Sequence, residues 1–239
     1  MKLTPELLLS APSYINAISD RELLLRGNNI PVIENLGVTR DLNESIDLTD
    51  NNITVLGNFP QMTRLKTLLI SRNRINSINS SSFAKSLPNL EMLVLSNNHL
   101  ANLADLVPLS QLPNLAYLSL VDNPVTYKDY YRLWVIWQNP HIRVLDFQKV
   151  KDAERVRAKE LFGTSPDQPT ELAAQILGSA RTRTFNVDAD GSVPGATTTT
   201  TTRKEMTEKE KDALRQQLKS ATSLAEISRI EQSLKSGYY

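Results

Sequence analysis

The pattern Leu-x-Leu-x-x-Asn-x-Leu recurs five times along this chain, with Ile or Val in place of some leucines. Its asparagines are Asn28, Asn51, Asn73, Asn98 and Asn123, so successive copies are 23, 22, 25 and 25 residues apart. A repeat of this length carries too little apolar surface to form a core alone. The copies must therefore stack, and each must bury its apolar residues against its neighbours.

Each Leu-x-Leu segment predicts a short strand whose leucines point inward while the residue between them points outward. The Asn lies where the chain leaves the strand, and its amide can pair with backbone groups that would otherwise be buried without partners. Strands stack about 4.8 Å apart, whereas helices need about 10 Å, so the strand side must be the inside of a curve. The sequence therefore predicts an α/β fold, a right-handed leucine-rich-repeat solenoid shaped like a horseshoe with a concave parallel sheet.

Both ends of such a stack need a cap. At the front, Thr4 and Pro5 are typical of a helix N-terminus, and the apolar residues of that helix are expected to continue to Ile18. The repeats occupy about 23–125, and the C-terminal cap follows at 126–163. Three elements are expected in this cap: an aromatic helix at 130–137, a final strand within 140–147 and an amphipathic helix at 149–161.

The capped domain is thus expected to span 1–163. Residues 164–202 are rich in Pro, Gly and Thr, which indicates a flexible linker with one short apolar stretch able to form a helix. Residues 203–236 contain two capping boxes and predict a C-terminal helical hairpin. A segment this short rarely folds alone, so we expect it to dock on another protein; packing on its own solenoid is the alternative. Its apolar face consists of Leu214, Leu218, Leu224, Ile227, Ile230 and Leu234.

The composition argues against catalysis. The chain has no cysteine, two histidines, no glycine-rich phosphate loop and no arrangement typical of a nucleophilic triad or a carboxylate pair. We therefore expect no enzyme, no cofactor and no metal site. With 27 basic and 26 acidic residues, nothing suggests a general polyanion binder. The early apolar run at 7–9 is too short for a signal peptide, so an intracellular protein is expected.

The outward strand positions supply the candidate binding surface. They form an apolar centre with acidic flanks, and an amphipathic partner helix with basic ends would fit them. The alternative is that they are ordinary half-exposed strand residues. Arg26 is the one basic residue among them, so a nucleic-acid backbone cannot be the main ligand of this face. The candidate partner-binding residues are Glu22, Leu24, Asp47, Leu69, Met92, Val94, Tyr117, Val121 and Asp146.

Basic residues also gather around the C-terminal cap, where Lys149 and Lys151 precede a helix with further Arg and Lys residues. Acidic residues dilute this cluster, so a solvated helix face explains it. The alternative is an edge that touches RNA held by a bound partner.

Segments outside the repeat skeleton resemble the U2 small nuclear ribonucleoprotein A′ family. Generic repeats share only the skeleton, so matches at variable positions are more specific. The segments are RELLLRG at 21–27, IPVIENLG at 30–37, NPVT at 123–126, YRLWVI at 131–136, VLDFQKVK at 144–151, RTFN at 183–186 and ATSLAE at 221–226. The resemblance covers about 1–163 and resumes in the tail. Trp134, Trp137 and the threonine run suggest a fungal member.

The resemblance implies a non-enzymatic spliceosome component in the nucleus. In that family the concave face holds a helix of an RRM protein called U2 B-double-prime, and the pair binds a stem-loop of U2 snRNA. By the same resemblance, limited direct RNA contact is expected at Arg26, Lys149 and Lys151, and the tail is expected to dock on other spliceosome proteins. A different class stays open, namely leucine-rich-repeat scaffolds that regulate a phosphatase or bind histones.

Overall fold

The computed structural model describes residues 2–79, 83–166 and 168–181, all of which belong to the first of the two units into which the chain divides, residues 1–185. The rest of the predicted linker and the predicted tail hairpin, including its apolar face, lie outside the described residues.

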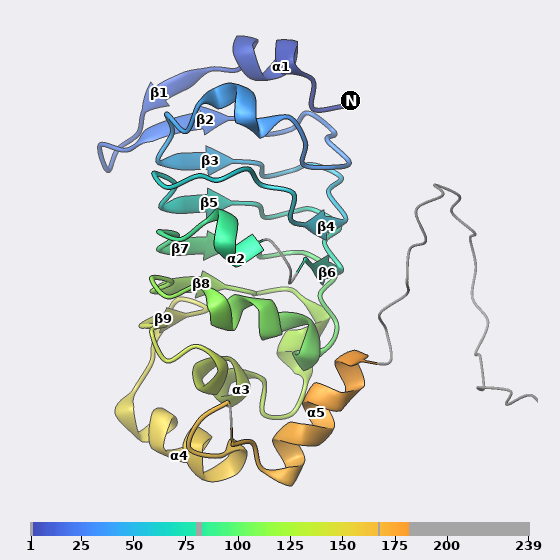
Figure 1. Cartoon of the computed structure of the whole chain (residues 1–239), viewed down its shortest axis with the longest axis vertical. Helices are drawn as coiled ribbons and strands as arrows, with labels where there is room; N and C mark the ends of the chain where they lie inside the picture. Colours follow the sequence, from blue (N-terminus) through green and yellow to red (C-terminus); the bar gives the residue numbers. More distant parts are fainter. Residues whose placement is uncertain (1, 80–82, 167, 182–239) are drawn as a thin grey trace, which may run out of the picture. The chain divides into compact units, whose positions relative to one another are not determined.

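The core of the unit is one eight-stranded sheet in the order β1-β2-β3-β5-β7-β8-β9-β10. Pairing is parallel from β2 to β9, and one antiparallel strand is added at each end. The strands are β1 (Ser13–Ile15), β2 (Arg21–Leu24), β3 (Ser45–Asp47), β5 (Thr67–Leu69), β7 (Met92–Val94), β8 (Tyr117–Ser119), β9 (Val144–Leu145) and β10 (Gln148–Lys149). Figure 1 shows β2 to β9 stacked in chain order, which confirms the leucine-rich-repeat fold.

The return segments of the repeats are short. They include a second, two-stranded sheet of β4 (Val55–Leu56) and β6 (Ser77–Ile78), together with α2 (Phe83–Ser86), η1 (Leu36–Thr39), η2 (Leu103–Gln111) and η3 (Pro124–Tyr127). The ends carry α1 (Pro5–Ser10), α3 (Tyr131–Gln138), α4 (Asp152–Phe162) and α5 (Glu171–Arg181). Apart from the nine-residue η2, the return elements are single helical turns or two-residue strands, so the repeats can stack closely on the return side as well.

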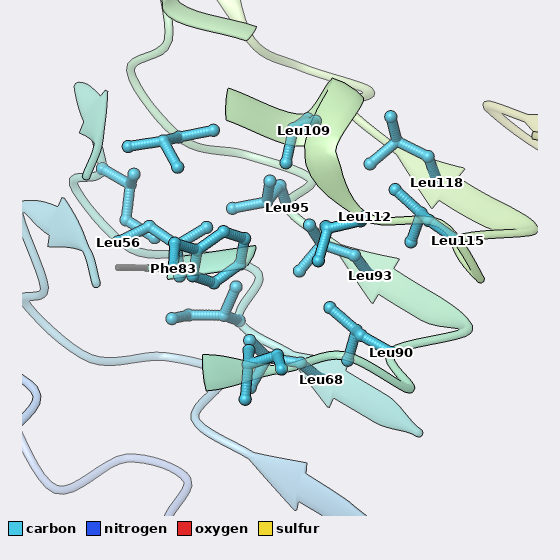
Figure 2. Packing of buried hydrophobic residues seen from close by; sticks show 14 of the residues in the cluster. Leu56, Leu68, Phe83, Leu90, Leu93, Leu95, Leu109, Leu112, Leu115 and Leu118 are labelled. Carbon is cyan, nitrogen blue, oxygen red and sulfur yellow. The ribbon is translucent and has the colours of Figure 1, made fainter. Parts of the chain in front are cut away.

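The inward leucines of successive strands lie directly beside one another. Leu68 pairs in register with Leu93, and Leu93 with Leu118, and all three are at most 2% exposed. Figure 2 shows these side chains packed with Phe83 and Leu112 of the return segments. The apolar stripe that one repeat cannot bury is thus covered by the next repeat.

The repeated asparagines link adjacent repeats through backbone hydrogen bonds. The Asn98 Nδ2 donates to the Leu95 carbonyl at 2.9 Å and to the Ile70 carbonyl at 3.1 Å, while its Oδ1 accepts from the Ile75 N–H at 3.0 Å. The same pattern is made by Asn51, Asn73 and Asn123. Asn28 has no full repeat before it, and its side chain donates to the Arg26 carbonyl.

We expect Asn98→Ala to lower the free energy of unfolding by about 1–3 kcal/mol, because it leaves buried backbone groups of two repeats unpaired. Asn98 is 2% exposed, so these backbone groups lie out of reach of bulk solvent in the folded stack. Urea denaturation of the full-length chain measures the change. The matched control is Asn76→Ala at an exposed position, which should shift stability by under about 0.5 kcal/mol. Equal stability of both variants would contradict the role of the repeated asparagines, the asparagine ladder, in linking adjacent repeats.

The front cap differs from the expected long helix. Thr4 does cap α1, and its Oγ1 accepts from the Leu7 N–H at 3.3 Å. The helix nevertheless ends at Ser10, because Pro12 disfavours the helical region for the residue before it, and Ala11 is already extended with ψ 138°. The chain then forms β1, which pairs antiparallel with β2 and covers the first edge of the sheet.

The rear cap extends beyond the expected boundary at Gly163. Trp134, Trp137 and Phe162 pack ring against ring, with centroids 5.2–5.5 Å apart. Ala173 of α5 joins this second core and is fully buried. The stretch 171–181, expected to belong mainly to a linker, is therefore part of the packed unit. Its apolar residues recur with helical spacing, which was the only sequence signal for it.

Candidate protein-binding site on the concave face

The concave face consists of the outward side chains of neighbouring strands, which the sheet register aligns in two rows. The first row is Glu22, Ser45, Thr67, Met92, Tyr117 and Val144. The second row is Leu24, Asp47, Leu69, Val94 and Ser119. The first row changes from polar to apolar side chains along the stack, so the two halves of the face have different chemistry.

In the N-terminal half of the face, the acidic side chains are buried and hydrogen-bonded to neighbouring residues of the same chain. Glu22 is 8% exposed, because the chain around β1 covers it. Its carboxylate accepts from the Tyr14 hydroxyl at 2.8 Å, from the Asn16 Nδ2 at 3.0 Å and from the Ser45 Oγ at 3.1 Å. Burial raises the pKa of Glu22, but these three donors outweigh it and hold the pKa below its ordinary value of 4.5.

Asp47 is also buried, and its Oδ1 accepts from the Thr49 N–H at 2.8 Å. Glu22 and Asp47, expected as acidic flanks of the groove, are thus both buried and hydrogen-bonded within the repeat unit, and their contact with a partner stays a prediction. The contact that covers Glu22 comes from a segment that was expected to be helical. Leu24 and Leu69 beside them are half-buried.

The C-terminal half of the face opens into an apolar pocket of about 120 Å³. Tyr117 is 44% exposed in its wall, and Met92, Val94 and Val144 are half-buried around it. Val121, just after β8, is half-buried but does not line the pocket. A recess of this kind, with an exposed aromatic ring and an apolar floor, is typical of the central contact of a protein interface.

Phe147 also lines this pocket, although no signal in the sequence marked it as a site residue. The pattern predicted one continuous strand to 147, with Phe147 pointing inward. Instead Asp146 and Phe147 form a two-residue turn between β9 and β10, with φ values of 51° and 63°. Phe147 is 79% exposed. A bulky residue at this φ is strained by about 1–3 kcal/mol, and Asn-Gly is the usual choice for such a turn.

Asp146, expected as an acidic flank of the groove, instead anchors this turn. Its Oδ1 accepts from the Leu120 N–H and its Oδ2 from the Tyr131 hydroxyl, both at 2.7 Å. Burial, and then the adjacent Asp146 carboxylate, raise the pKa of Tyr131, so the hydroxyl stays protonated as a donor. The carboxylate therefore positions Phe147 at the pocket rather than standing free.

We expect Phe147→Gly to raise the free energy of unfolding while weakening partner binding. Glycine adopts φ 63° without strain, so stability should rise by about 1 kcal/mol. The same change removes the exposed ring from the pocket, and Kd for a protein that binds there should rise by about tenfold. Thermal denaturation and partner titration measure the two effects, with Tyr127→Ala, an exposed aromatic outside the pocket, as control. Unchanged affinity would remove Phe147 from the site.

The three basic residues expected to touch RNA do not form one patch. Lys149 lies in β10 and Lys151 immediately precedes α4, and both are exposed. Arg26 is also exposed, but it follows β2 at the other end of the sheet order. Any RNA contact through all three would need a ligand that reaches both ends of the stack.

The described ranges hold no group of three or more His, Cys, Asp or Glu residues arranged to bind a metal ion. Nor does any helix within them combine the length and the apolar character needed to cross a bilayer.

Comparison with known proteins identifies the family. The leucine-rich-repeat family model matches residues 1–177. The U2 small nuclear ribonucleoprotein A′ of Neurospora crassa is 49% identical over 240 residues, which cover 99% of this chain and 94% of the relative. This chain belongs to the U2 small nuclear ribonucleoprotein A′ family. The human U2 A′ protein is 45% identical and covers 99% of this chain, and the match covers 89% of the human protein.

A solved U2 A′ structure supports the same assignment. A chain of the Drosophila melanogaster SNF/U2A′ complex is 42% identical, has a TM-score of 0.68 and covers 75% of this chain and 99% of its own length. The resemblance noted in the segments around the repeats is thus confirmed. The U2 A′ family members also match along the tail that the structure leaves undescribed, because the Neurospora relative aligns with nearly the whole chain.

Proposed function

We propose that this U2 A′ family member is a non-enzymatic structural subunit of the U2 small nuclear ribonucleoprotein in pre-mRNA splicing. Its concave face binds a helix of the RRM protein U2 B-double-prime. The observation that carries the proposal is the apolar pocket beside Tyr117 and Phe147. The related Drosophila chain was solved as an SNF/U2A′ complex, which supports a protein partner for this fold.

The chemistry of the face favours a helix over a nucleic acid. Neither row contains a Lys or Arg side chain, and a phosphate backbone requires such residues. A helix presents apolar side chains at i, i+3 and i+4, and one such side chain can enter the pocket while its neighbours contact Leu69 and Val94. Because Glu22 and Asp47 are occupied, apolar contact in the C-terminal half supplies most of the affinity.

RNA recognition belongs to the heterodimer in this proposal. The partner's RRM binds the U2 snRNA stem-loop, and Arg26, Lys149 and Lys151 add contacts to phosphates near the edges of the repeat unit. Residues 203–236 dock on other spliceosome proteins, and the assembled particle places the chain in the nucleus. The exposed Lys149 and Lys151 lie at the pocket end of the sheet, which supports a position near the partner.

The test is affinity purification of the tagged full-length chain from nuclear extract, with and without ribonuclease. We expect U2 snRNA in the untreated sample and an RRM protein that remains bound after ribonuclease. Loss of the RRM protein with the RNA would contradict direct protein contact. Recovery of a phosphatase or of histones without U2 snRNA would favour the other class of repeat scaffold.

A further inference from the structure

A second surface lies at the N-terminal end of the repeat unit. A groove of about 560 Å³ runs beside α1 and η1, the blue end of the unit in Figure 1. Buried Leu8 and Leu23 contribute to its floor, while Leu9 is 75% and Leu42 is 49% exposed at its sides. None of the outward residues of the two concave rows lines it, so this groove and the concave site can be occupied together.

The end of a solenoid normally presents a polar outer surface, because no further repeat covers it. Here the cap exposes leucines instead. Val38 of η1 lies half-buried in the same groove, so apolar side chains from α1, from η1 and from the segment before β3 converge there. Exposed apolar side chains that converge on one groove, rather than being scattered, are typical of a binding surface.

The charged side chains that line the groove are all basic. Arg21 and Arg40 are exposed residues in its lining, and no carboxylate lines it. None of the four ion pairs found in the described residues involves either arginine. The Arg21 Nε donates to the Ser13 Oγ at 3.2 Å, which leaves the remaining guanidinium donors available to a ligand.

The carboxylates near this end of the stack are engaged elsewhere. Glu44 lies 3.3 Å from the Arg64 guanidinium and 3.7 Å from the Lys66 ammonium, and Asp20 lies 3.5 Å from the same ammonium. Asp41 accepts from the Thr63 backbone N–H at 2.9 Å and from its hydroxyl at 2.8 Å. The Arg21 backbone N–H also donates to the Glu44 Oε2 at 3.0 Å. A ligand carboxylate would therefore meet two guanidinium groups that form no ion pair within the described residues.

We infer that this groove is a docking site for an acidic amphipathic segment of a second protein partner. Apolar side chains of the segment pack on Leu9, Val38 and Leu42, and its Asp or Glu side chains pair with Arg21 and Arg40. The apolar floor favours a peptide over RNA as the ligand, because a charged phosphate backbone gains no binding energy from contact with buried leucines. The site lies at the opposite end of the sheet from Lys149, so the chain can bridge two proteins.

The test places a photo-crosslinking benzoylphenylalanine at Leu9 of the full-length chain within the purified ribonucleoprotein. We expect crosslinks to one protein segment in which apolar residues alternate with several Asp or Glu residues. A synthetic peptide of that segment is then titrated against the full-length chain by fluorescence anisotropy. The double variant Arg21→Glu and Arg40→Glu should raise the Kd of the peptide at least about tenfold, because the new carboxylates repel its acidic side chains where the arginines attracted them.

Two further variants keep this test decisive. Leu9→Asp should also weaken the peptide, and because Leu9 is largely exposed the fold should be retained, as circular dichroism can verify. Arg74→Glu, at an exposed arginine outside the groove, should leave the affinity unchanged. Crosslinks to RNA alone, to a basic segment or to nothing would overturn the inference, as would peptide binding that the double variant does not weaken. None of these outcomes depends on the concave site.

Discussion

Tyr117→Glu should abolish measurable binding of the proposed RRM partner while leaving the repeat unit folded. The substitution places a carboxylate in an apolar pocket that a bound helix would close off from water. Burying an unpaired charge costs about 3 kcal/mol or more, which is about a hundredfold in Kd. The free chain tolerates the change because Tyr117 is 44% exposed before the partner arrives. Isothermal titration calorimetry with the purified RRM protein, without RNA, measures the loss.

The matched control is Tyr127→Glu. This residue is 84% exposed on η3 and does not line the pocket, so the same charge change should leave the affinity within about twofold. If Tyr117→Glu binds as tightly as the control, the partner contacts some other surface, and the assignment of the C-terminal half of the concave face fails.

Trp134→Ala should produce the largest loss of stability among the substitutions considered. Trp134 is fully buried, packs against Trp137 and Phe162, and donates its indole N–H to the Leu103 carbonyl at 2.9 Å. Truncating such a residue costs about 3–5 kcal/mol. For a unit of this size the melting temperature should fall by about 10 °C. The cap would loosen first, because α3, α4 and α5 share this second core.

Trp134→Phe separates the contribution of ring packing from that of the indole hydrogen bond. It keeps a ring in the cluster but leaves the Leu103 carbonyl without its donor, so a loss of about 1–2 kcal/mol is expected. Val156→Ala, at an exposed position of α4, should change stability by under about 0.5 kcal/mol. Differential scanning calorimetry of the three variants tests this order. Equal melting temperatures for Trp134→Ala and Val156→Ala would contradict the claim that the aromatic core of the C-terminal cap stabilises the repeat unit.

The repeat architecture could be predicted because each of its signals is local and repeated. Leu68, Leu93 and Leu118 occupy the same position of each copy, and an inward leucine has no other place to be buried. The asparagine ladder follows for the same reason, since Asn98 and its equivalents meet the same backbone groups in every repeat. Asn28 departs from the pattern only because the stack begins there.

The binding site was harder to predict because it depends on contacts between segments that the repeat does not define. The alternation of inward and outward residues continues through 144–148, so nothing in it marks the turn that exposes Phe147. Glu22 occupies an outward position, yet Tyr14 and Asn16 cover it through a strand that pairs from outside the repeats. The apolar residues of the pocket, by contrast, are repeat positions, and Met92, Val94 and Tyr117 were identified correctly as outward-facing.

Hydrogen–deuterium exchange of the full-length chain with and without the purified RRM protein, in the absence of RNA, tests the central proposal most directly. We expect a stable complex without RNA and slower exchange at 92–94, 117–119 and 144–149, where the pocket and the Phe147 turn lie. The residues around Glu22 should change little, because they are already covered. A complex that forms only with RNA, or protection confined to segments away from the pocket, would contradict it.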